Sequence, residues 1–174
     1  SGNNWDFGTG TVTTNTLTEG TDTHYPGLDE SINFPTNLGG GATMAGNFGI
    51  STENSASFEF WLKVDSTAAD DNYLIFETGD NNDGFSIIYD KTNNQVELYY
   101  DDDDSSDTAV VTANLGSIDP TTEFIQIVAT LNNNEAAQTD DIILYINGGS
   151  AVGGVTASAN LGADLDWASN TGSG

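Results

Sequence analysis

The chain has 174 residues, enough to bury a sizeable core, and 36% of them are hydrophobic, including 8 Phe, 6 Tyr and 3 Trp, which is typical of a folded protein. Two basic residues stand against 27 acidic ones, and the net charge of −25 excludes nucleic acid and anionic membrane surfaces as partners, because both require basic patches. The chain contains no cysteine and no run of 18 apolar residues, so we expect neither disulfides nor membrane insertion.

Residues 1–29 predict an opening edge strand followed by loops. Trp5, Asp6 and Phe7 begin this strand, and residues 15–22 are polar and turn-prone. Residues 31–35 predict a short strand that ends at a proline, and residues 38–49, with three consecutive glycines, predict a loop.

The centre of the chain predicts four consecutive antiparallel strands. In the first, residues 58–64, apolar side chains alternate with Glu59, Trp61 and Lys63, and this period of two places one set on each face of a sheet. The other three are predicted at residues 73–78, 84–90 and 95–100, and the polar residues 91–94 form the loop of a hairpin.

Four more strands follow in the second half. They are predicted at residues 109–113, 124–131, 142–147 and 155–159, and the near-continuous apolar run at 124–131 suits burial on both faces. Residues 161–174 are irregular, and 168–174 form a loose tail. Many short strands with frequent turn signals predict an all-β, two-sheet antiparallel jelly-roll sandwich in a single domain of residues 1–174.

The hairpin register has a consequence for the acidic residues. Pairing 84–90 with 95–100 places residues whose numbers sum to about 185 opposite each other, so Asp83 should lie near Asp101 and Asp102. Two like charges about 8 Å apart repel by roughly 2 kcal/mol at an effective dielectric constant near 20. Carboxylates gathered at one strand end are therefore costly unless they are screened, spread into water or bound to a cation.

The acidity leaves three interpretations open: a solvated, salt-adapted surface, calcium binding, or adhesion to a polar ligand through a cation. Asp outnumbers Glu 19 to 8 and gathers with Asn and Gly in loops, which favours Ca2+, a cation that prefers oxygen ligands. The spacing of an EF-hand is absent, so a site would be assembled from two loops. The candidate ligands are Asp80, Asp83, Asp101, Asp102, Asp103 and Asp104.

Aromatic side chains are candidates for contact with sugar rings, since they pack on apolar sugar patches. Alternation sends one of Tyr99 and Tyr100 inward, so only one can line a site, and Trp61 is expected in the core or between the sheets. His24, the only histidine, lies in a predicted turn and is expected to be exposed. The candidate ligand-binding residues are Tyr99, Trp167, Asp140, Asp141, Asp164 and Asp166.

The stretch SFEFWLKVD at residues 57–65 resembles the concanavalin A-like superfamily in its laminin-G-like or pentraxin-like jelly-roll branch. The resemblance extends over about residues 30 to 167 and departs from the family pattern after Trp167, where the closing strand with an acidic pair and Val-Arg or Ile-Arg is absent. Either the chain stops short of that strand, or residues 5–7 fill the edge. The matching positions are Ser57, Phe58, Phe60, Trp61 and Lys63, then Leu74-Ile75-Phe76, Gly79-Asp80, residues 124–131 and residues 142–148.

The resemblance implies a calcium-dependent module that binds carbohydrate or protein at a cell surface or in a large bacterial adhesin. We therefore expect a lectin-like, monomeric module of a longer, exported surface protein, with a glycan or other cell-surface ligand as its partner. A calcium-rigidified spacer, a protein-binding module and an ancillary domain of a polysaccharide-degrading enzyme remain alternatives. No enzymatic activity is expected, because the Glu-x-Asp-x-x-Glu strand of jelly-roll glucanases is missing and no Cys or His pair forms a nucleophile–base couple.

Overall fold

The computed structural model describes residues 55–79, 84–101, 108–132 and 140–162, together with four short strands nearer the N-terminus. The chain divides into two compact units, Ser1–Gly46 and Asn47–Gly174. In the described residues no helix is long and apolar enough to cross a membrane.

The first unit contains two small antiparallel pairs. β1 (Trp5–Asp6) pairs with β4 (Thr43–Met44), and β2 (Thr18–Gly20) pairs with β3 (Ser31–Asn33). The predicted opening strand is therefore present, but its partner is β4 rather than an edge of a larger sheet. β2 and β4 lie where the sequence predicts turns or loop; the backbone ladders that they form with β3 and β1 override their weak local propensity.

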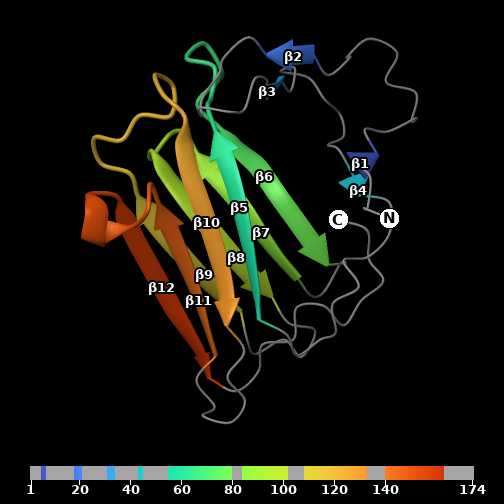
Figure 1. The fold of residues 1–174 in the computed structure, drawn as a ribbon, viewed down its shortest axis with the longest axis vertical. Coiled ribbons are helices and arrows are strands. Elements are labelled where there is room, and N and C mark those ends of the chain that lie inside the picture. The colour runs from blue at the N-terminus through green and yellow to red at the C-terminus, as the bar shows by residue number, and fades with distance from the viewer. Residues whose placement is uncertain are drawn as a thin grey trace. The chain divides into compact units, whose positions relative to one another are not determined.

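The second unit is a sandwich of two four-stranded antiparallel sheets, which confirms the predicted all-β fold (Figure 1). One sheet has the strand order β12-β11-β10-β5 and the other has the order β6-β7-β8-β9. The single-turn 3-10 helix η1 (Ser150–Val152) precedes the last strand. The strands are β5 (Ala56–Leu62), β6 (Asn72–Gly79), β7 (Gly84–Asp90), β8 (Gln95–Asp101), β9 (Ala109–Asn114), β10 (Ile125–Asn132), β11 (Asp140–Ile146) and β12 (Val155–Gly162).

β5 is the main departure from the predicted order of strands. Instead of preceding β6 in one sheet, it pairs with β10, with Phe60 opposite Ile127, and the chain then crosses to the other sheet. Phe58 and Phe60 consequently reach Phe76 of β6 across the core, with ring centroids 5.2 and 5.0 Å apart. All four consecutive strands predicted here are present, but β5 does not pair with β6, because its partner is about 70 residues away in sequence and no local pattern encodes it.

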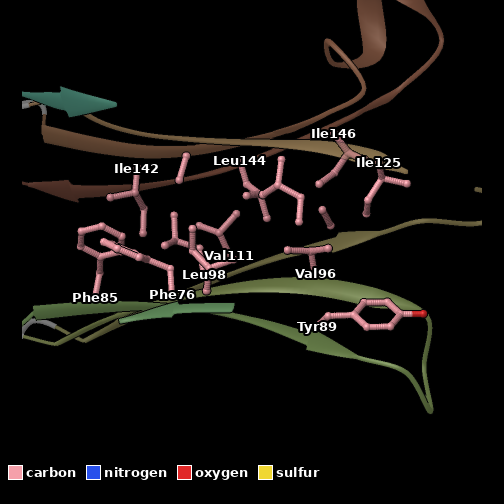
Figure 2. Packing of buried hydrophobic residues seen from close by; sticks show 14 of the residues in the cluster. Phe76, Phe85, Tyr89, Val96, Leu98, Val111, Ile125, Ile142, Leu144 and Ile146 are labelled. Carbon is pink, nitrogen blue, oxygen red and sulfur yellow. The ribbon is translucent and has the colours of Figure 1, made fainter. Parts of the chain in front are cut away.

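The core lies between the sheets and takes alternate residues from each strand. Figure 2 shows Phe76, Phe85 and Ile142 at one end of this layer and Tyr89, Ile125 and Ile146 at the other. Each fully buried side chain of this size contributes about 1.5–3 kcal/mol. β10 was predicted to be buried on both faces, but its outer residues Gln126, Val128 and Thr130 are only partly buried, so it alternates.

The turn between β7 and β8 lies at the end of the sandwich away from the predicted acidic loops, and side-chain hydrogen bonds stabilise it. Asp90 accepts hydrogen bonds from the backbone N–H of Asn93 (3.0 Å) and from its side-chain amide (2.6 Å). Asn94, at φ 51°, donates its amide to the carbonyls of Gly116 and Ile118 and accepts the hydroxyl of Tyr89. The predicted hairpin is confirmed, and its loop also anchors the connection that follows β9.

Candidate functional site

The predicted gathering of acidic loops can be tested on the backbone of the strands that flank them. Gly84 lies opposite Asp101, a pair whose numbers sum to 185 as predicted, and Gly79 lies opposite Gly84. The rings of Phe58 in β5 and Phe85 in β7 lie 4.9 Å apart at the same end of the core, so the β12-β11-β10-β5 sheet ends there too. At this end of the β12-β11-β10-β5 sheet, Asn132 lies opposite Asp141. We call this end, where Gly84, Asp101 and Asp141 lie, the acidic strand end.

The structure describes only part of the predicted site. Among the proposed calcium ligands, the backbone of Asp101 lies at the end of β8, and Asp80, Asp83, Asp102, Asp103 and Asp104 lie outside the described residues. Among the proposed ligand-binding residues, Asp140 and Asp141 begin β11, whereas Asp164, Asp166 and Trp167 also lie outside them. Within the described side chains, no three His, Cys, Asp or Glu residues gather. The calcium site therefore stays a prediction.

Tyr99 is the predicted ligand-binding aromatic whose side chain the structure describes. It is 37% exposed on the outer face of β8, whereas Tyr100 is 2% exposed and belongs to the core. The prediction that one of the two tyrosines points inward is confirmed, and the outward one is Tyr99. Its ring therefore offers an aromatic surface to solvent.

A hydrogen-bonded row runs along the outer face of β8 from Tyr99. The hydroxyl of Tyr99 donates to Oε2 of Glu97 at 2.6 Å, and the amide of Gln95 donates to Oε1 of the same carboxylate at 2.6 Å. The hydrogen bond to Glu97, together with burial and the negative charge of Glu97, raises the pKa of Tyr99. The phenol therefore keeps its proton up to a higher pH than an ordinary tyrosine does. Each Glu97 oxygen retains a further acceptor position, which suits a hydroxyl-rich ligand.

The neighbouring strands add apolar groups to this face. Val110 of β9 lies opposite Tyr99 and is 51% exposed. Leu74 of β6 is 57% exposed and lies opposite Ile88 of β7, which in turn lies opposite Glu97. A β-bulge between Leu74 and Phe76 makes Ile75 an extra residue, so that Leu74 and Glu77 both lie on the outer face. Sequence reasoning did not single out Glu97, Val110 or Leu74 as binding residues. The period of two from Tyr99 to Glu97 and Gln95 is the signal that identifies the row.

Trp61 was predicted in the core or between the sheets, and the structure corrects this. Phe60 and Leu62, its neighbours in β5, pack against the core, so the register position of Trp61, opposite Gln126 of β10, is on the outer face of the other sheet. It is partly buried there. Strand alternation took precedence over the general preference of large aromatics for the interior.

The end of the sandwich opposite to the acidic strand end carries charges with structural partners. Lys91, whose side chain is 11% exposed, donates to the carbonyls of Ser66 and Ala68 and lies 3.4 Å from the carboxylate of Asp70. The carboxylates of Asp65 and Asp119 each cap a turn by accepting hydrogen bonds from Thr67 and Thr121, which lower the pKa of both aspartates. These groups stabilise loops and do not form a recognisable binding site.

A comparison with protein families shows what the chain is similar to. The model of the family Laminin_G_3, described as concanavalin A-like lectin/glucanases superfamily, matches residues 26–172, most of the chain. No significant match was found among curated proteins or among solved structures.

Proposed function

We propose, on the premise that this chain belongs to the Laminin_G_3 family of the concanavalin A-like lectin/glucanases superfamily, that it is a calcium-dependent carbohydrate-binding module of an exported bacterial surface protein. Membership supports a carbohydrate-binding type of module in general. Calcium dependence and a role in adhesion outside the cell are our own extension of it.

The observation that carries the proposal is the exposed ring of Tyr99 beside the carboxylate of Glu97 on an outward sheet face. An aromatic face packs on the C–H surface of a pyranose, and a carboxylate accepts its hydroxyl groups. Solvent-facing tyrosines are ordinary, but this one has a fixed orientation, because its hydroxyl is held by Glu97. The pair is therefore prepared to receive a sugar without further ordering.

The acidic strand end supports the calcium part of the proposal. Asp101 follows Tyr99 by two residues in β8, a rise of about 7 Å along a strand. The residues that fit calcium there are Asp80, Asp83, Asp101, Asp102, Asp103 and Asp104, because their carboxylate oxygens are the ligands that this cation prefers. A bound cation would relieve the repulsion between these groups and could receive vicinal hydroxyls of the same sugar.

We propose binding without catalysis. Glycoside hydrolysis requires two carboxyl groups placed on either side of the scissile bond. The register neighbours of Glu97 on β7 and β9 are Ile88 and Thr112, and its outer-face neighbours along β8 include Gln95 and Tyr99. This environment suits hydrogen bonding more than proton transfer.

A spacer is the rival from a different class. The net charge of −25 favours it, because a strongly acidic surface can simply be solvated or stiffened by cations without recognising a ligand. A protein-binding role, or an ancillary role beside a polysaccharide-degrading enzyme, would use the same fold.

A glycan array probed with the protein, once with millimolar calcium and once with EDTA, tests the proposal. We expect binding to a defined set of glycans that EDTA abolishes. Binding that persists in EDTA would refute the calcium requirement, and no binding in either condition would leave the spacer as the better account. Asp101→Asn and Asp83→Asn should reproduce the effect of EDTA, and Asp70→Asn, at the opposite end, is the matched control.

A further inference from the structure

The outer face of the β6-β7-β8-β9 sheet carries most of the large hydrophobic side chains that are exposed in the described residues. Four large hydrophobic side chains in the described residues are exposed, and three of them, Leu74, Tyr99 and Val110, lie on this face. Exposed apolar groups that gather on one face, with polar groups around them, mark binding surfaces more often than scattered ones do.

The side chains of this face form rows that run across the strands. One row is Glu77, Ser86, Tyr99 and Val110, and the next is Leu74, Ile88, Glu97 and Thr112. Successive rows lie about 7 Å apart along the strands, and four strands span about 14 Å. Each row thus combines apolar contacts with groups that donate or accept hydrogen bonds.

We propose that this sheet face binds an uncharged, extended oligosaccharide that lies across the strands and occupies several subsites. The inference rests on the proposed carbohydrate-binding function and deepens it, since it extends the contact from Tyr99 and Glu97 to Val110 and Leu74. Tyr99 stacks on one sugar ring, Glu97 accepts hydroxyl groups through its free acceptor positions, and the two aliphatic side chains contact the C–H surfaces of neighbouring units.

Charge decides which kind of oligosaccharide fits. The face carries Glu77 and Glu97, and the protein as a whole carries a net charge of −25. Both lysines are engaged elsewhere: Lys91 with loop carbonyls and Asp70, and Lys63 over the ring of Phe124. Uronic acid or sulfated chains would therefore be repelled, whereas the hydroxyl hydrogens of a neutral chain are attracted to the acceptors.

The test is a calorimetric titration, in calcium buffer, with neutral probes of increasing length. The probes are glucose, galactose, mannose and xylose, their β-linked or α-linked trioses and hexaoses, and hexagalacturonate as the anionic counterpart. We expect at least one hexaose to bind about tenfold or more tightly than its monosaccharide, because several subsites are filled, and hexagalacturonate not to bind. Equal affinity for a monosaccharide and its hexaose would overturn the extended site.

Variants locate the contact on this face. Tyr99→Ala, Glu97→Gln and Val110→Thr should each weaken hexaose binding, the first two by about tenfold. Glu59→Gln is the matched control for Glu97→Gln, because Glu59 lies on the outer face of the other sheet and accepts the amide of Gln126 at 2.7 Å, much as Glu97 accepts that of Gln95. Val152→Thr is the control for Val110→Thr, since Val152 is exposed outside both sheets. Circular dichroism verifies that each variant folds.

Each outcome separates the two proposals. Hexaose binding that the Tyr99, Glu97 and Val110 variants leave unchanged would overturn the sheet-face site and leave carbohydrate binding intact. Failure of every neutral probe to bind would overturn the sheet-face site, and only failure on the glycan array as well would overturn both proposals. Sedimentation of the same samples covers a second occupant: a dimer of the wild type that Val110→Thr dissociates would assign the face to another copy of the chain, against our proposal.

Discussion

The hydroxyl of Tyr89 donates a hydrogen bond of 3.1 Å to the side-chain oxygen of Asn94, across the turn that joins β7 to β8. Tyr89 is buried at the end of the core, and the backbone of Asn94 is in the left-handed region at φ 51°. The same asparagine accepts the backbone N–H of Leu115 and donates to two carbonyls in the connection after β9. One residue therefore joins the core, the turn and the next loop.

Replacing Asn94 should destabilise the protein more than its exposure suggests. Asn94→Ala leaves the Tyr89 hydroxyl and two loop carbonyls without this partner and keeps a side chain at positive φ, so we expect a loss of about 2–4 kcal/mol in the free energy of unfolding. Asn94→Gly relieves the strain but not the lost hydrogen bonds and should recover only part of it. Urea unfolding measures the difference, with the exposed Thr92→Ala as control; a change below about 0.5 kcal/mol would contradict the assigned role.

Asp90 should make stability depend on pH in the acid range. Hydrogen bonds from the side chain and backbone of Asn93 lower the pKa of Asp90 below its ordinary value. Because the folded-state pKa is lower than the unfolded-state pKa of about 3.9, this carboxylate stabilises the fold above pH 4, and the contribution is lost as the pH falls through the folded-state pKa. Asp90→Asn should therefore cost about 1 kcal/mol at pH 7.

The difference in the free energy of unfolding between the wild type and Asp90→Asn should become smaller as the pH falls below about 4. Urea unfolding of both proteins at several pH values measures it. Asp65 and Asp119 also have lowered pKa values and are present in both proteins, so the difference between the two curves isolates Asp90. A difference in the free energy of unfolding that is constant with pH would refute the electrostatic explanation.

Cations should stabilise the fold, and calcium should do so more than its ionic strength explains. A net charge of −25 repels itself, and salt screens this repulsion, so the melting temperature should rise with NaCl. If calcium binds at the acidic strand end, a millimolar concentration should raise the melting temperature by several degrees beyond NaCl of equal ionic strength, about the effect of 1–2 kcal/mol. Calorimetry of the wild type and Asp101→Asn measures it. Equal curves in the two salts would argue for screening alone.

Substitutions at two glycines separate the cost of a steric clash from the cost of an unfavourable backbone conformation. A Cβ on Gly154 would lie 1.9 Å from the carbonyl oxygen of Ile146, so Gly154→Ala must displace the backbone at the start of β12 and should cost about 2 kcal/mol or more. A Cβ on Gly116 meets nothing, but its φ is +62°, so Gly116→Ala should cost about 1 kcal/mol. Thermal unfolding ranks the two variants, and the reverse order would contradict the structure.

Asn147 shows how a short motif acts through a distant strand. Its side-chain oxygen accepts the backbone N–H of Gln126, and its own N–H donates to the carbonyl of Gln126, so it extends the ladder between β10 and β11 beyond Ile146. Its φ of 50° turns the chain into Gly148. The structure thus supplies the reason for an asparagine at this position, within the stretch 142–148 that matches the family pattern.

Local pattern alone determined the all-β class, most strand positions in the second unit, the register of the β7–β8 hairpin and the opposite directions of Tyr99 and Tyr100. These properties depend on period-two alternation and on a four-residue loop, which act between residues close in sequence. Tertiary structure decided the pairing of β5 with β10, the outer-face position of Trp61 and the bulge at Ile75 that brings Leu74 into register with Ile88 and Glu97. Those depend on contacts between residues far apart in the chain, where the free energy of packing two sheets, rather than any local preference, selects the partner.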